Sequence, residues 1–209
     1  GTNRLYGWLD ENVGVEFLPV DFVNDPRVIA QEREFVSINA TTEVDFLGQA
    51  ASETIAGKYY SGSGGQADFA KGAMLAHGGQ GFIVLRSTTS DGTVSRIVPR
   101  LARGSVVTTL KNTVDKVVTE WGVADLRGRS LTERARALIS IAHPDFREQL
   151  TKEAVHMGYL RERVWGYLRW RPELTAASGR RGPRAARAGR GAGCRPRWRR
   201  GSRARARAA

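Results

Sequence analysis

A glycine-rich stretch directly before a predicted helix is the first feature of this sequence that could do chemistry. Gly62, Gly64 and Gly65 stand in SGSGGQADF, and the residues from Gln66 onward carry an apolar pattern typical of a helix. Glycine adopts positive φ without penalty, so the N–H groups of such a loop can converge on an anion or an oxyanion, and the following helix N-terminus adds partial positive charge. A turn that needs glycine only for packing is an equally good interpretation. No Gly-Lys-Ser/Thr follows and GxGxxG is absent, which excludes the usual nucleotide-binding loops.

Isolated polar residues are weaker candidates. Asn39 ends a short apolar run, where a carboxamide can contact a ligand carbonyl but more often caps a turn. Strand alternation places Glu43 and Asp45 on one face, and Glu53 follows nearby. Nothing in the pattern marks any of these carboxylates as buried or activated. Asp68 falls in the first turn of the predicted helix, where the helix dipole alone favours an acid, so we predict a structural role for it.

Metal binding and triad catalysis have no support in the residue spacing. His77, His143 and His156 lie far apart without ligand spacing, and we expect His143, just before Pro144, to be a local helix cap. The single cysteine, Cys194, excludes an intrachain disulfide and favours a cytosolic setting. No apolar run approaches a membrane span and no signal peptide pattern is present.

The elements that must position the candidate residues alternate between strands and helices. Predicted strands cover 35–38, 43–47, 82–85, 94–98, 106–109 and 117–119, the first two possibly as a hairpin. Predicted helices cover part of 5–17 and residues 66–74, and the first of them is followed by an apolar run that could enter the core as a strand. Two more helices are predicted, one that begins with a capping box at Ser130–Glu133 and one that begins at Pro144 and ends at Gly158. This order favours an α/β domain that ends near residue 160.

The net charge comes entirely from the last residues. The 209 residues carry a formal charge of +12, and residues 171–209 hold 13 arginines and one acid, Glu173, which is again +12. Residues 1–170 are therefore formally neutral, and charge-driven nucleic-acid binding would belong to the tail, without specificity. We expect residues 161–209 to be a disordered Arg/Ala/Gly-rich tail. It could be a basic binding arm, an extension without function or, the interpretation we favour, a frameshift or read-through of GC-rich DNA.

Six segments occur in a specific order along residues 1–160. They are PVDFVNDPRVIAQ (19–31), FVSINATTEVDFLGQAASETIAG (35–57), SGSGGQADFAKGA (61–73), DGTVSRIVPRLARGSVVTT (91–109), VVTEWGVADLRGRSLTERARALISIAHPDFREQL (117–150) and GYL (158–160). In sequence and in order they resemble the C-terminal domain of the acetyl-CoA hydrolase/transferase family, within the family I CoA-transferases. The likeness runs from about residue 1 to residue 160 and is greatest toward 4-hydroxybutyrate and butyryl-CoA:acetate CoA-transferases.

This resemblance implies an α/β fold of the NagB/RpiA/CoA-transferase-like type, a mostly parallel sheet flanked by helices with a β-rich insertion around 35–60. It also implies transfer of CoA between carboxylic acids through a glutamyl-CoA thioester, with the CoA thioester as substrate and no permanently bound cofactor. Asn39, in the family's S-[IV]-N motif, and Gly62, Gly64 and Gly65, in its SGxGGQxDF motif, match positions that line the thioester and acyl pocket. Thr42 and Gln66 are chosen for adjacency to them.

One departure from the family pattern concerns the nucleophile. The family's glutamate lies in a His-Ser/Thr-Glu segment, which residues 1–209 do not contain, so we expect an inactive fragment of a two-domain enzyme. Likeness also implies a homo-oligomer for the whole enzyme, acting on acyl-CoA and a small carboxylate without a membrane partner. Acetyl-CoA hydrolysis, a non-catalytic CoA-binding or subunit-interaction module, and nucleic-acid binding through the tail remain as alternatives.

Overall fold

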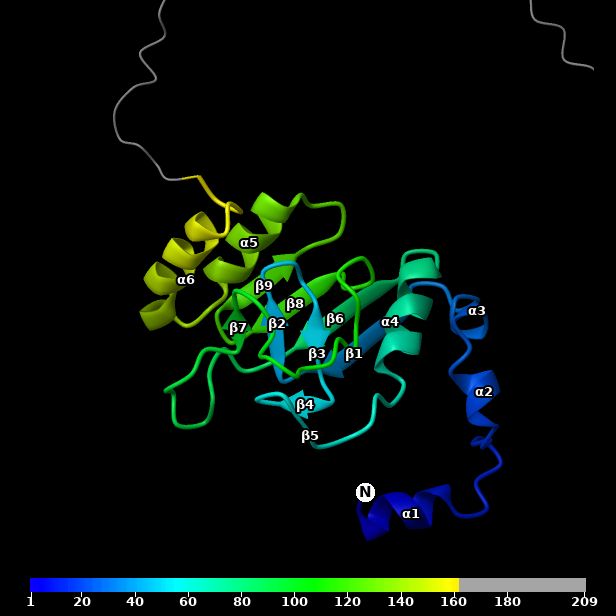
Figure 1. Cartoon of the computed structure of the whole chain (residues 1–209). Helices are drawn as coiled ribbons and strands as arrows, with labels where there is room; N and C mark the ends of the chain where they lie inside the picture. The colour runs from blue at the N-terminus through cyan, green and yellow to red at the C-terminus, as the bar shows by residue number, and fades with distance from the viewer. Residues whose placement is uncertain (162–209) are drawn as a thin grey trace, which may run out of the picture. The chain divides into compact units, whose positions relative to one another are not determined.

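The computed structural model describes residues 1–161, coloured from blue to yellow in Figure 1. The helices are α1 (Asn3–Leu9), α2 (Val20–Val23), α3 (Pro26–Ile29), α4 (Gln66–Leu75), α5 (Leu131–Ser140) and α6 (Pro144–His156). The strands are β1 (Val36–Ala40), β2 (Glu43–Asp45), β3 (Ala50–Ala51), β4 (Thr54–Ile55), β5 (Lys58–Tyr59), β6 (Gln80–Val84), β7 (Ile97–Val98), β8 (Lys116–Thr119) and β9 (Gly122–Asp125). The predicted tail lies outside the described residues, apart from Arg161. None of the helices within residues 1–161 has the length and apolar character that a membrane span requires.

The main sheet has four strands in the order β1-β6-β8-β9. β1, β6 and β8 are parallel, and β9 returns antiparallel to β8. Neighbouring β1 and β6 are joined by a connection that contains α4, and this is the connection parallel strands require because they cannot be joined by a tight turn. The predicted α/β class, a mostly parallel sheet flanked by helices, is confirmed.

The hydrophobic core lies between the main sheet, a smaller sheet and helices α5 and α6. The smaller sheet has the order β3-β2-β7, and β4 pairs with β5 as a separate two-stranded unit. Ile83 of β6 and Val117 of β8 are paired in register and bury their side chains in this core with Val44 of β2 and Leu138 of α5. The site candidates are therefore attached to a packed framework.

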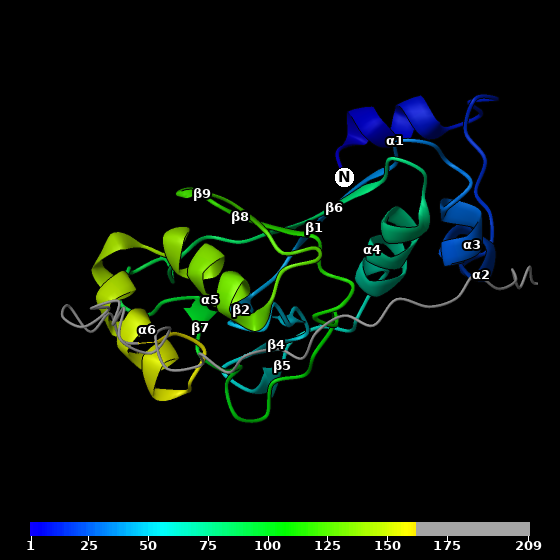
Figure 2. The same cartoon turned by 90° about the horizontal axis from the view of Figure 1, so that it is seen from above.

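The opposite face of the main sheet carries apolar side chains that remain accessible. Val36 and Ile38 of β1 are 49% and 67% exposed, and Val123 of β9 is 57% exposed. These residues alternate with the buried ones along each strand, so they lie on the other face. Figure 2 shows α4 and α5 on the same side of the four strands. Within residues 1–161, one face of the sheet is thus covered and the other is open.

Several predictions for the β-rich region are corrected. Segments 35–38 and 43–47 do not form a hairpin, because β1 pairs in parallel with β6 while β2 pairs with β3 and β7. Residues 106–109 form no strand and contribute only a bridge between Thr109 and Ala50. Strand β9 was missed. The insertion predicted around 35–60 is real only from β2 onward, since β1 belongs to the main sheet.

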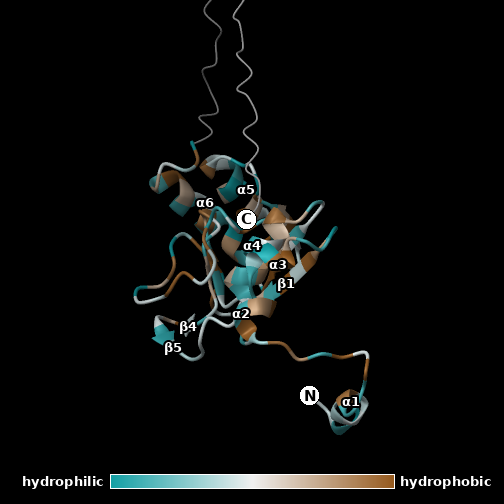
Figure 3. Cartoon of the chain, turned by 90° about the vertical axis from the view of Figure 1, so that its right-hand side faces the viewer, coloured by the Kyte–Doolittle hydropathy of each residue, from teal (hydrophilic) through white to brown (hydrophobic). Residues whose placement is uncertain are grey.

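The N-terminal apolar run is also not a strand. Residues 15–19 connect α1 to α2, and Phe17 is 82% exposed. Figure 3 colours much of this connection as hydrophobic. An apolar pattern there predicts burial, but within residues 1–161 no element covers it.

The helix-end predictions are confirmed. Ser130 and Glu133 form the capping box at the start of α5, with the Ser130 N–H 2.8 Å from a Glu133 carboxylate oxygen. His143 is the N-cap of α6 and accepts a hydrogen bond from the Asp145 N–H. Gly158 follows the C-cap with φ of 74°, the left-handed conformation typical of a glycine helix stop.

Candidate functional site

The carboxyl ends of the parallel strands are where the predicted residues gather. Val36, at the start of β1, lies beside Gln80, at the start of β6, and α4 directly precedes β6. A crossover helix runs back along the sheet, so the first turn of α4 lies toward the carboxyl edge. Figure 1 shows this arrangement. The Gly62–Gly65 loop therefore comes to the edge at which β1 ends with Asn39 and Ala40, and ligands of open α/β sheets bind at this kind of edge.

The Gly62–Gly65 loop is exposed at its first three residues and half-buried at Gly65. Within residues 1–161 the N–H groups of these four residues make no hydrogen bond. The Gly62 carbonyl accepts from the Ser61 hydroxyl at 3.2 Å, and the Gly65 carbonyl accepts from the Phe69 N–H of α4. Gly64 has φ of 55°. A Cβ added at Gly62 or Gly64 would meet no atom within 4 Å. Packing does not require glycine at these two positions.

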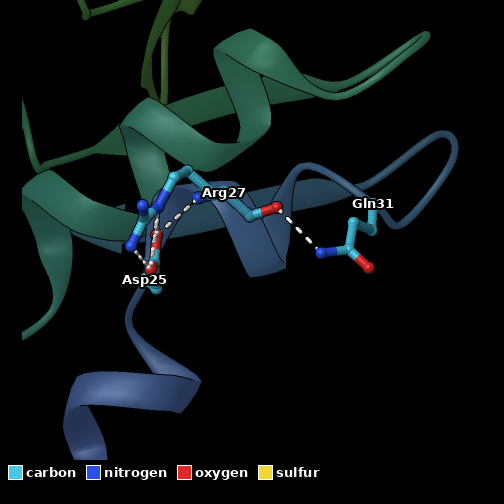
Figure 4. Close-up of polar contacts among 3 residues, drawn as sticks. All are labelled: Asp25, Arg27 and Gln31. Atoms are coloured by element: carbon cyan, nitrogen blue, oxygen red, sulfur yellow. Dashed lines mark hydrogen bonds and ion pairs between the residues drawn. The ribbon is translucent and has the colours of Figure 1, made fainter. Parts of the chain in front are cut away.

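Gly65 differs because it is held in a close contact. A Cβ on Gly65 would lie 2.6 Å from Nδ2 of Asn24, and this nitrogen donates to Asp68 of α4 at 3.3 Å. Asn24 precedes α3, whose N-cap Asp25 accepts from the backbone N–H and the guanidinium of Arg27, as Figure 4 shows. These hydrogen bonds hold the pKa of the Asp25 carboxyl below its usual value. The turn before α3 thus fixes the base of the glycine loop, and the predicted structural role of Asp68 agrees with its contact.

Asn39 is half-buried on the covered side of the main sheet. Its Nδ2 donates to the Ser37 hydroxyl at 2.8 Å. The side-chain oxygen, Oδ1, makes no hydrogen bond within the described residues. Its backbone pairs with Ile83 of β6. The strand therefore fixes the position of a carboxamide at the carboxyl edge.

Thr42 and Gln66 use their polar atoms inside the fold. The Thr42 hydroxyl lies 2.6 Å from the Ala51 carbonyl and 2.7 Å from the Thr54 carbonyl. Gln66 is buried, and its Nε2 donates to the Thr109 hydroxyl at 3.0 Å. Their predicted role in ligand binding stays a prediction, while the contacts give both residues a structural task.

The carboxylates Glu43, Asp45 and Glu53 each accept hydrogen bonds from the chain. Glu43 accepts from the Ser105 hydroxyl at 2.6 Å, and Glu53 accepts from the Thr108 hydroxyl at 3.0 Å. Asp45 is buried and accepts from the backbone of the following turn; burial raises the pKa of its carboxyl, an effect those hydrogen bonds oppose. All three therefore serve as acceptors that organise loops.

A cavity of about 340 Å³ lies beside this edge and was not anticipated from the sequence. It is lined by Thr42 and by two arginines, Arg96 and Arg100, that sequence reasoning passed over. The sequence feature that could have indicated this cavity is Arg96, a charged residue within the apolar alternation of 94–98. Charged side chains are rarely buried in a strand without a partner.

A family model, the acetyl-CoA hydrolase/transferase C-terminal domain, matches residues 1–154. A succinyl-CoA:cyclohexane-1-carboxylate CoA transferase of Geobacter metallireducens is 56% identical over 157 residues, 75% of this chain and 36% of that protein. A 4-hydroxybutyrate coenzyme A transferase of Clostridium kluyveri is 52% identical over 153 residues, 73% of this chain and 36% of that protein. The chain thus spans about a third of the length of these relatives.

Solved structures agree with the sequence comparisons. The crystal structure of RipA from Yersinia pestis superposes with a TM-score of 0.72 at 45% identity, covering 77% of this chain and 36% of that one. A 4-hydroxybutyrate CoA-transferase of Porphyromonas gingivalis superposes with a TM-score of 0.62 at 42% identity, covering 75% of this chain and 35% of that one. This second structure and the Clostridium kluyveri relative carry the same enzyme name.

Proposed function

The chain belongs to the acetyl-CoA hydrolase/transferase family through its C-terminal domain, and on that premise we propose that it forms the thioester-binding wall of an acyl-CoA:carboxylate CoA-transferase. In this proposal the free N–H groups of the Gly62–Gly65 loop, together with the Asn39 carboxamide, hold the thioester carbonyl oxygen. The nucleophile is a glutamate from outside residues 1–161.

The proposed chemistry proceeds by exchange at carbonyl carbons. The glutamate carboxylate attacks the thioester carbonyl, the C–S bond breaks, and CoA leaves as a thiolate from an acyl-glutamyl anhydride. The thiolate then attacks the glutamyl carbonyl, which releases the first carboxylate and leaves a glutamyl-CoA thioester. A second carboxylate repeats these steps in reverse, so glutamate is regenerated and a new acyl-CoA departs.

Each addition places negative charge on a carbonyl oxygen, and fixed N–H donors stabilise such an oxygen most when they need not reorganise. The observation that carries the proposal is the loop itself. Its N–H groups make no hydrogen bond within the described residues, and Gly62, Ser63 and Gly64 are exposed at the carboxyl edge, beside the first turn of α4. That turn adds further N–H groups without helical acceptors.

Calorimetric titration of the 209-residue chain with butyryl-CoA tests the proposal. Gly64→Val places a β-branched side chain at positive φ in the loop, and we expect it to weaken binding at least tenfold. Gly128→Val is the matched control, because Gly128 is also exposed, has φ of 71°, and has no atom within 4 Å of an added Cβ. Equal affinity of the two variants for butyryl-CoA would show that the loop is not part of the binding site.

Hydrolysis is the second candidate, because the matching family model includes hydrolases. The two reactions differ in whether water or a carboxylate resolves the glutamyl-CoA thioester. In an enzyme that carries this domain, adding acetate to butyryl-CoA separates them. Transfer predicts acetyl-CoA with little free CoA, whereas hydrolysis predicts free CoA that does not depend on acetate.

A further inference from the structure

Residues 5–23 form an arm whose apolar side chains have no covering surface within residues 1–161. No residue of helix α1 is buried, and Trp8 within it is 60% exposed. Phe17, on the connection after α1, is 82% exposed. A helix of seven residues is marginal in water unless it packs against another surface. Packing against a partner would therefore stabilise α1 and remove these side chains from water.

The arm is also uniformly acidic. It contains no lysine or arginine, and its four carboxylates are all exposed; they belong to Asp10, Glu11, Glu16 and Asp21. None of them forms an ion pair with another described residue. The surface that complements the arm is accordingly both apolar and basic.

A groove of this kind lies between α5 and α6. It has a volume of about 400 Å³, and its apolar lining comes from Ile139, Val155 and Leu160. Its charged lining residues are Arg136, Arg147 and Arg161, and no acid of the described chain lines it. All its lining residues fall within 136–161, so the arm of the same chain does not occupy it.

The three arginines of the groove are available to a partner. Within residues 1–161 none of them forms an ion pair with a carboxylate. Glu133 of α5 pairs with Arg129, and Glu148 of α6 pairs with Lys152. The positive charge of the groove is therefore not neutralised by ion pairs with the two helices that form it.

The arm offers the two kinds of group that arginine binds. Trp8, Asp10 and Glu11 place one large aromatic ring and two carboxylates close together in the chain. Guanidinium groups bind carboxylates through charge-assisted hydrogen bonds and also stack on aromatic faces. Arg147 already makes such an aromatic contact, 5.7 Å from the centroid of the Trp121 ring. Arm and groove thus match in charge and in apolar character.

We infer that the arm of one copy of this chain docks in the α5–α6 groove of a second copy. Trp8 packs against the apolar lining, and Asp10 and Glu11 lie on the arginines. With twofold symmetry the two copies exchange arms, so both arms and both grooves are covered in one closed dimer. The inference goes beyond the proposed function, since it requires neither the Gly62–Gly65 loop nor a thioester.

Sedimentation velocity of the 209-residue chain over a range of concentrations tests the inference. We expect a monomer–dimer equilibrium whose dissociation constant rises at least about tenfold with Arg136→Glu in the groove or Asp10→Arg in the arm. Both side chains are exposed, so the core is undisturbed. Arg33→Glu is the matched control, because it makes the same charge change at an exposed residue outside the arm and the groove. It should leave the dissociation constant unchanged.

An equimolar mixture of the two weakened variants tests the pairing of arm with groove. A dimer of one Arg136→Glu copy and one Asp10→Arg copy contains one unaltered contact and one contact with its charges exchanged. We therefore expect the mixture to recover most of the affinity that each variant lacks by itself.

A chain that stays monomeric at every concentration overturns the inference, and so does a dimer that Arg136→Glu and Arg33→Glu weaken equally. A mixture that associates no more than the separate variants overturns it as well. A dimer weakened by Asp10→Arg but not by Arg136→Glu would place the arm on another basic surface, such as the arginines of residues 171–209. That outcome would also reject the groove as the docking site.

Discussion

The two ends of α4 carry glycine turns that look alike in the sequence and differ in the structure. Gly62 and Gly64, before the helix, have open space around them, and the N–H groups there are unpaired within residues 1–161. Gly79, after the helix, is buried, and a Cβ on it would lie 2.1 Å from the Ala73 carbonyl oxygen. Packing explains the glycine after the helix and leaves the loop before it available for a ligand.

The two turns differ in whether the fold requires glycine for packing. At Gly79 the absence of a side chain lets the chain pass close to α4 before entering β6. At the Gly62–Gly65 loop only Gly65 is confined, by Asn24. If this distinction is right, substitutions in the two turns have opposite effects on stability and on binding.

The largest loss of stability is expected from Gly79→Ala. The new methyl group overlaps a backbone carbonyl that cannot move without shifting α4, and overpacking of this kind costs roughly 3 kcal/mol. Urea denaturation of the 209-residue chain measures the change. A loss below about 0.5 kcal/mol, the range of an ordinary surface substitution, would show that the two turns do not differ.

Gln66→Leu should cost less, roughly 1–2 kcal/mol, because it leaves the buried Thr109 hydroxyl without its donor. The Gln66–Thr109 hydrogen bond joins the first turn of α4 to the β3 region, so it anchors the C-terminal end of the Gly62–Gly65 loop. A double-mutant cycle with Thr109→Val isolates the interaction, and we expect a coupling of about 1 kcal/mol. Additive effects of the two substitutions would mean that this hydrogen bond does not anchor the loop.

Gly64→Ala tests whether the positive φ of the loop backbone favours glycine. With φ of 55°, an alanine there should cost about 1 kcal/mol from strain alone, since no atom crowds it. Asparagine tolerates this conformation better, so Gly64→Asn should cost less than Gly64→Ala. The reverse order in thermal unfolding would indicate crowding and would make this turn resemble the one at Gly79.

Gly62→Ala should leave stability within about 0.5 kcal/mol of the unchanged chain. There is open space for the methyl group and no positive φ at this position. It therefore serves as the matched substitution for Gly79→Ala in the same urea experiment. A loss as large as that of Gly79→Ala would contradict the open environment of the loop.

Local signals in the sequence were enough to predict α4, α5, α6 and the glycine loop, but not the short helices α2 and α3. The capping box at Ser130 and the stop at Gly158 depend on residues within one turn, so their interpretation needs no tertiary information. The pairing of β1 with β6 could not be predicted in the same way. It joins Asn39 to Ile83 across the β2–β5 insertion and α4, while the segment at 43–47 offered a partner much nearer in the sequence.

The candidate site was only partly accessible to sequence reasoning for the same physical reason. Motif likeness indicated Asn39 and the Gly62–Gly65 loop, but the inward hydrogen bonds of Thr42 and Gln66 depend on Ala51 and Thr109, which are distant in the chain. The unpaired charge of Arg96 depends on which side chains the fold brings near it. A single arginine in an apolar run does not reveal that.

The central claim is that the N–H groups of the Gly62–Gly65 loop and the Asn39 carboxamide bind an acyl-CoA thioester. It is tested most directly by ¹⁵N-resolved NMR of the 209-residue chain, titrated with butyryl-CoA and separately with CoA, because weak binding is still visible there. The account predicts that butyryl-CoA, and not CoA, shifts the backbone amides of Gly62, Gly64 and Gly65 and the side-chain amide of Asn39. Equal shifts with both ligands, or shifts confined to other residues, would contradict it.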